Sequence, residues 1–132
     1  MAKNETFGWL ALYGIQRHQF NFEDIDITDK LMLQGQINAR RKEWHELILI
    51  LDEVQGKLVA VSVEINNIVK ELTENAVKNG TRLNQELSTN DEYIQLEAEQ
   101  KALTVGVSLI NGQIDYCKND LRILNSVFYA KF

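Results

Sequence analysis

Apolar residues recur every seven positions over residues 28–79, at the two positions of each heptad that are called a and d. The a positions are Ile37, Trp44, Leu51, Leu58, Ile65 and Leu72, and the d positions are Leu33, Leu47, Val54, Val61 and Ile68. A repeat sustained over about five heptads predicts a long helix that packs lengthwise against another helix.

A second heptad repeat of the same kind runs from residue 93 to residue 128. Its a positions include Tyr93, Val107, Ile114, Leu121 and Phe128, and its d positions are Leu96, Leu103, Ile110, Cys117 and Leu124. Two helices of one period joined by a short turn predict an all-α fold, a long antiparallel helical hairpin that resembles a coiled coil. Gln100 is the polar residue at an a position of this repeat, and we predict that it sets the register of the two helices.

The start of the first helix is marked by residues whose side-chain oxygens satisfy unpaired helix amides. Asp26, Thr28 and Asp29 precede the first repeat, and the two aspartates also place negative charge at the positive end of the helix. We therefore expect the helix to begin at about Thr28.

Two positions are candidates for the end of the first helix. Asn79-Gly80 suits a stop, because both residues tolerate the left-handed backbone conformation common at helix C-termini. Leu83 and Leu87 are spaced as in a helix, however, so the helix could instead continue to Ser88. Thr89 followed by Glu92 has the spacing of a capping box, which predicts that the second helix starts near Asn90.

Residues 1–27 are less regular and rich in aromatic side chains, and we predict an N-terminal arm there, followed by a hairpin domain over residues 28–132. The arm either folds back over the core of its own domain or reaches onto a neighbouring subunit. A two-helix hairpin has much surface for its volume, so we expect a homo-oligomer. In the second alternative, the arm residues of the oligomer interface are Trp9, Phe20 and Phe22.

Composition supports this all-α prediction. The chain has 132 residues and no proline, a residue that interrupts long helices. Its single cysteine, Cys117, cannot form an internal disulfide, so we expect a cytoplasmic protein, in the host cytoplasm if a phage encodes it. No apolar run approaches the ~18 residues of a membrane span, and we expect no membrane association.

The sequence contains few of the motifs that mark catalytic or metal sites. It has no glycine-rich phosphate loop and no CxxC pair, and its two histidines, His18 and His45, are far apart. Cys117 lies at a d position, where a packing role is favoured over a reactive thiol. We predict a protein that is not an enzyme and that uses neither a metal nor a cofactor.

One basic run stands out from a chain whose net charge is −5. Arg40, Arg41 and Lys42 directly precede Trp44 and His45. Cations beside an exposed aromatic ring can grip phosphates while a base stacks on the ring, so the run is a candidate nucleic-acid site, which Lys30 would extend. The alternative is an ordinary solvated helix face, with Trp44 in the helix–helix contact.

The order of these segments resembles that of the phage recombination mediators of the UvsY type. The resemblance covers residues 22–132. It rests on the segment Ile25-Asp26-Ile27-Thr28-Asp29-Lys30-Leu31 before a long helix with Trp44, on Asn90-Asp91-Glu92-Tyr93-Ile94-Gln95-Leu96-Glu97 at the start of the second helix, and on Leu121-Arg122-Ile123-Leu124 before an aromatic and basic tail.

The resemblance implies a ring-like homo-oligomer that binds single-stranded DNA and helps a RecA-type recombinase to displace single-strand-binding protein. In that family the C-terminal helix is associated with oligomerisation, which here implies an interface through Ile114, Leu121, Leu124 and Phe128. Glu71 and Glu74 lie on the long helix where the family tends to carry basic residues, so Arg40–Lys42 is the segment left for DNA.

Two functions from different classes therefore stand beside each other. The first is an oligomeric recombination mediator that binds single-stranded DNA. The second is a helical structural or interaction protein, such as a virion component, a scaffold or an acidic inhibitor, whose partner is another protein.

Overall fold

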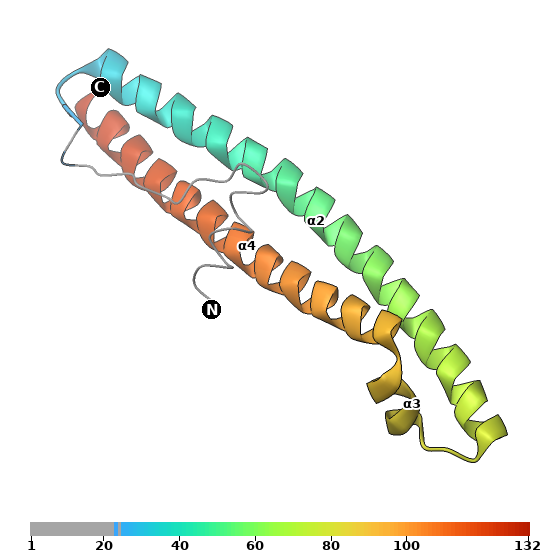
Figure 1. Ribbon diagram of the computed structural model, residues 1–132. Coiled ribbons are helices and arrows are strands. Elements are labelled where there is room, and N and C mark those ends of the chain that lie inside the picture. The colour runs from blue at the N-terminus through green and yellow to red at the C-terminus, as the bar shows by residue number, and fades with distance from the viewer. Residues whose placement is uncertain (1–22, 24) are drawn as a thin grey trace. The chain divides into compact units, whose positions relative to one another are not determined.

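The computed structural model describes Glu23 and residues 25–132, and this part of the chain is helical. Helix α2 spans Lys30–Asn79, the short helix α3 spans Leu83–Thr89, and helix α4 spans Asp91–Lys131. The two long helices pack in opposite directions as a hairpin (Figure 1). The all-α hairpin predicted from the two heptad repeats is confirmed at this level. No helix in the described range is long and apolar enough to cross a membrane.

The chain divides into two compact units, and each long helix contributes to both. Unit 1 comprises Met1–Asp52 and Ser108–Phe132, and unit 2 comprises Glu53–Val107. Each unit thus contains a part of α2 and a part of α4, with α3 belonging to unit 2.

The core of unit 1 is formed by a and d residues of both helices and by one residue from the arm. Ile25 is buried there against α2 and α4, so this end of the predicted arm covers the core of its own chain. Trp9, Phe20 and Phe22 lie outside the described residues. The core cluster consists of Ile25, Leu33, Ile37, Leu121 and Leu124, with Trp44, Val127 and Phe128 packed against it.

The core of unit 2 follows the same two repeats. Its buried apolar residues are Val54, Val61, Ile65, Ile68, Leu72, Ala76, Leu96 and Leu103. Burial of these side chains removes apolar area from water at about 25 cal/mol per Å², which favours the helix pairing. The a and d assignment therefore identified the packed faces of both helices.

The first helix begins as its capping residues predict. Asp29 is the cap, because its Oδ1 accepts a hydrogen bond from the backbone N–H of Met32 at 3.1 Å. Asp26 closes the preceding turn by accepting from the backbone N–H of Thr28 at 2.9 Å and from its hydroxyl at 2.5 Å. The hydroxyl bond is the main cause that lowers the pKa of Asp26.

Of the two candidate ends of the first helix, Asn79-Gly80 is confirmed, because α2 ends at Asn79, and its continuation to Ser88 is wrong. Gly80 has φ +66°, and the N–H of Thr81 bonds to the carbonyl of Ala76 at 3.0 Å, which is the Schellman arrangement at a helix end. Leu83 and Leu87 belong to a helix of their own, α3, which ends at Thr89. The chain therefore turns at Gly80 and again at the end of α3.

The predicted capping box at Thr89 is wrong, although the start of α4 is confirmed to within one residue. The cap is Asn90, whose Oδ1 accepts from the N–H of Tyr93 at 2.9 Å. Asn90 has extended backbone angles, as a cap requires, whereas Thr89 is the last residue of α3. The Thr89 hydroxyl instead donates to the carbonyl of Gln85 at 3.1 Å.

Gln100, the polar residue of the second repeat, forms a hydrogen bond with the other long helix. Its Nε2 donates to Ser62 Oγ at 3.1 Å, and this hydroxyl donates in turn to the carbonyl of Leu58 at 2.8 Å. The bond joins α4 to α2 within unit 2, and both groups are partly buried. A sliding of one helix along the other would separate this pair, so the bond favours one register.

Replacement of Ser62 by alanine is expected to lower the free energy of unfolding by about 1 kcal/mol, because the Gln100 amide loses its acceptor. The double variant Ser62→Ala/Gln100→Leu should lie close to the wild type, since both polar groups are then gone. Urea unfolding followed by circular dichroism measures both values. Equal stability of the wild type and Ser62→Ala would contradict the assigned role.

Two glycines give opposite expectations for substitution by alanine. A Cβ added at Gly56, inside α2, meets no atom within 4 Å, so Gly56→Ala should raise the free energy of unfolding by about 0.5–1 kcal/mol. Gly80→Ala should lower it by about 1 kcal/mol, because the positive φ strains an alanine. Thermal unfolding of the two variants tests whether Gly56 lies inside the helix and Gly80 at its end. Melting temperatures that shift in the same direction would contradict this placement.

Candidate nucleic-acid interface

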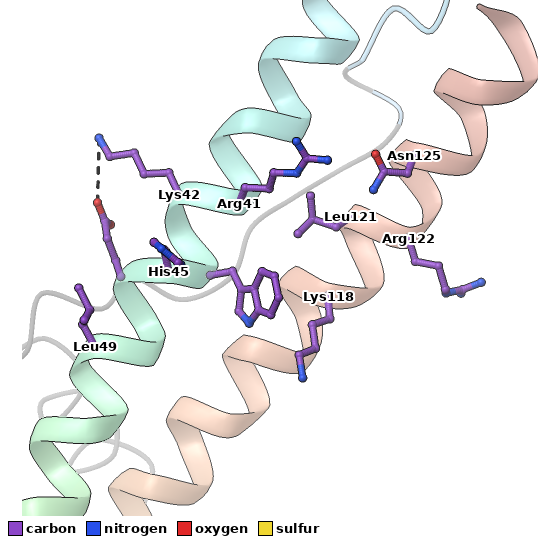
Figure 2. A pocket seen from close by; sticks show the side chains of 10 residues that line it. Arg41, Lys42, His45, Leu49, Lys118, Leu121, Arg122 and Asn125 are labelled. Atoms are coloured by element: carbon purple, nitrogen blue, oxygen red, sulfur yellow. Dashed lines mark ion pairs between the residues drawn. The ribbon is translucent and has the colours of Figure 1, made fainter.

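Trp44 lies at the edge of the core of unit 1, half in the helix contact and half in a surface groove. Its ring packs against the buried cluster around Leu33 and Leu124. The same ring lines a groove with a cavity volume of about 790 Å³, between the α2 segment 41–49 and the α4 segment 118–125 (Figure 2). Trp44 therefore contributes to the helix contact and also lines a surface groove, and base stacking on its ring stays a prediction.

Cationic side chains from both helices line this groove. Arg41 and Lys42 come from α2, and Lys118 and Arg122 come from α4. The remaining lining residues are Trp44, His45, Glu46, Leu49, Leu121 and Asn125. Four of the lining side chains are cationic and one is a carboxylate, although the whole chain is acidic, and the surface inside the groove itself is mainly apolar.

Lys118 is held over the face of the tryptophan. Its Nζ lies 5.8 Å from the centroid of the Trp44 ring, which is within cation–π distance. Lys118 and Arg122 are four residues apart and so share a face of α4. Arg122 donates to Asn119 Oδ1 at 3.0 Å, which orients the guanidinium without neutralising it.

The ion pair of Lys42 does little to neutralise the groove. Lys42 Nζ lies 4.0 Å from Glu46 Oε1, and the two side chains are 80% and 62% exposed. Exposed pairs of this kind contribute 0–1 kcal/mol and are screened by salt. Lys42 therefore remains able to exchange Glu46 for an anionic ligand.

Arg40, the first residue of the basic run, has a different environment. Its Nη1 lies 2.7 Å from Glu43 Oε2, and the two side chains are 20% and 30% exposed. Arg40 occupies a d position and is not a lining residue of the groove. The structure thus separates Arg40 from Arg41 and Lys42, its neighbours in the sequence.

Lys30 is also not brought to the groove. It is the first residue of α2, and its Nζ lies 6.0 Å from the centroid of the Phe128 ring. Of the four residues predicted to bind nucleic acid, the structure brings together Arg41 and Lys42.

Sequence reasoning missed the contribution of α4. Lys118 and Arg122 are isolated cations in the sequence, so no basic run marks them. Their spacing of four was the available signal, because it places both on one helix face. Their proximity to Trp44 depends on the register of α4 against α2, which the heptad pattern alone did not specify.

Three of the four C-terminal residues assigned to an oligomer interface are buried in the core of their own chain. Ile114, Leu121 and Leu124 are 6%, 7% and 1% exposed, and Phe128 is half-buried against the same core cluster. An a or d position facing α2 cannot also face a second subunit unless the hairpin opens. An interface through these residues would therefore compete with the fold of the chain itself.

Cys117 is a packing residue of the core beside the groove. It is fully buried and forms no disulfide. Burial, with the negative charge of Glu43 second, raises the pKa of the Cys117 thiol to about 11. A thiol of this kind is a poor nucleophile at neutral pH.

No cluster of three or more potential metal ligands occurs among the residues that the structure describes. No family model, curated protein or solved structure matches this chain.

The environment of Cys117 gives a test of the packing in unit 1. At pH 8 a thiol with a pKa of about 11 is ionised to roughly one part in a thousand, so the folded protein should react with iodoacetamide much more slowly than free cysteine does. Unfolding in urea should restore the ordinary rate. Mass spectrometry of timed samples measures both, and rapid labelling of the folded protein would contradict the described core.

Proposed function

We propose that this chain is a non-enzymatic protein that binds single-stranded nucleic acid in the groove around Trp44. The observation that carries the proposal is a groove lined by four cationic side chains from two helices and by the partly buried Trp44 ring, over which Lys118 Nζ lies at 5.8 Å from the ring centroid. Cations that follow a phosphate backbone, combined with an aromatic ring on which a base stacks, form the usual means of binding single strands without reading their sequence.

The shape of the groove favours a single strand over a duplex. Trp44 packs partly into the core between α2 and α4, so its ring is recessed. The bases of a duplex are stacked on each other, and one could reach such a ring only by leaving the stack, at a cost of a few kcal/mol. An unpaired base pays less of this cost, and its stacking on an aromatic ring is worth about 1–3 kcal/mol.

The biological role that fits this binding best is that of a recombination mediator. Support comes from the UvsY-type order of segments, from the confirmed all-α hairpin, and from the cationic groove. On this proposal the chain holds single-stranded DNA for a RecA-type recombinase, with Arg41, Lys42, Lys118 and Arg122 as phosphate contacts.

A second candidate function, that of a helical interaction protein, is favoured by apolar residues on the outer face of α2 in unit 2. Val59 and Val63 are four residues apart and are 64% and 52% exposed. Outward-facing apolar neighbours are typical of surfaces that bind another protein. Failure of oligonucleotide binding in the test below would leave this function as the better supported one.

The proposal predicts that removal of groove cations weakens binding and reduces its salt dependence. In the variant Arg41→Gln/Lys118→Gln, one cation is lost from each helix. The slope of log affinity against log salt for a single-stranded oligonucleotide should fall in magnitude by about 1.4, since each phosphate contact on a single strand contributes about 0.7. Fluorescence anisotropy at several salt concentrations measures this slope.

The control variant is Lys57→Gln/Lys101→Gln, which makes the same change in net charge and also removes one cation from each helix, but in unit 2. Its slope should equal that of the wild type. Equal losses in both variants would mean that overall charge, and not the groove, governs binding. The absence of binding by the wild type at low salt would overturn the proposal.

A further inference from the structure

The groove that carries excess positive charge has a counterpart of opposite charge elsewhere in the chain. The nine residues Asp91–Glu99, which open α4 in unit 2, contain four carboxylates and no cationic side chain. Charge is thus segregated between a cationic groove in unit 1 and an acidic segment in unit 2. Segregation of this kind favours contacts in which unlike surfaces meet.

The acidic segment also carries an apolar side chain that projects into solvent. Ile94 is 47% exposed, and Asp91 and Glu97 lie three residues before and after it, so they flank it on one helix face. The groove has the complementary arrangement, because Trp44 and Leu49 line it between the cations of α2 and α4. Leu49 is 68% exposed and would gain cover from such a contact.

We propose that the segment Asp91–Glu99 of a second copy of this chain docks in the Trp44 groove. Ile94 of the incoming copy packs against Leu49 and Trp44, while its Asp91 and Glu97 pair with Arg41, Lys42 and Lys118. A helix cannot fold back on itself, so a segment of α4 reaches a groove that α4 itself lines only from another copy.

Charge also argues against the N-terminal residues of the chain as the occupant. Residues 1–22 contain two cations, Lys3 and Arg17, and one carboxylate, Glu5. A segment whose cations outnumber its carboxylates does not complement the four cations of the groove. The segment at the start of α4 does, and this selects the second copy.

The contact is heterologous, because the groove of one copy meets a different surface of the next. Repetition of such a contact closes into a ring or continues as an open chain. This contact differs from the oligomer interface expected from the sequence. It uses exposed residues such as Ile94 and Leu49, whereas Leu121 and Leu124 are buried in the core. If the groove also binds single strands, which rests on the proposed function, then nucleic acid and the neighbouring copy compete for it.

A charge-swap experiment tests the contact directly. One variant reverses the groove, Arg41→Glu/Lys118→Glu, and the other reverses the segment, Asp91→Lys/Glu97→Lys. Light scattering at about 100 μM protein and low salt, conditions that populate weak interfaces, should show the wild type associated. Each variant alone places like charges opposite each other and should dissociate, with an affinity reduced by at least about tenfold.

An equal mixture of the two variants restores opposite charges at every contact, so association should return to the level of the wild type. Circular dichroism first establishes that both variants retain the helix content of the wild type. A monomeric wild type, or a mixture that stays dissociated, would overturn the proposal.

Oligonucleotide binding separates this proposal from the proposed function. The segment variant leaves every groove residue in place, so it should bind a single-stranded oligonucleotide at least as tightly as the wild type does. If association behaves as described and no variant binds the oligonucleotide, the contact between copies stands and nucleic-acid binding falls. If the oligonucleotide binds while the mixture fails to associate, nucleic-acid binding stands and the contact between copies falls.

Discussion

The packing of a and d side chains from α2 against those from α4 is the constraint on which the rest of the structure depends. Neither helix can bury its apolar face alone, and long helices are stabilised mainly by such contacts and not by intrinsic propensity. The pairing excludes water from residues such as Leu33, Ile110 and Leu124. It also determines which outward-facing residues of α2 lie beside which residues of α4, so the groove is a consequence of the helix pairing.

Register is the link between the packing and the site. Trp44 occupies an a position of α2, and its ring lies beneath Lys118, which follows Cys117, a d residue of α4. A shift of one heptad would place residue 111 or 125 near Trp44 instead, and both of these are asparagines. The cationic groove therefore exists in only one alignment of the helices, and the Gln100–Ser62 bond favours one alignment within unit 2.

The sequence predicted the helices and their packed faces well, because hydrophobic periodicity is a local and repeated signal. It predicted the site only in part. Arg41 and Lys42 were identified as candidates because they are consecutive, whereas only the fold brings Lys118 and Arg122 to the same groove. Arg40 belonged to the same run, but its d position directs it to Glu43. The oligomer residues Leu121 and Leu124 illustrate the same difficulty, since one apolar repeat cannot show whether its partner is in the same chain or another.

Fluorescence of Trp44 tests the central claim most directly, that the groove around this ring receives a nucleic-acid base. The variant Trp9→Phe leaves Trp44 as the sole tryptophan. Titration with a single-stranded oligonucleotide at low salt should quench its emission to saturation, and added salt should reverse the quenching as phosphate contacts are lost. Emission that stays unchanged while the oligonucleotide binds would place the contact elsewhere and contradict the account.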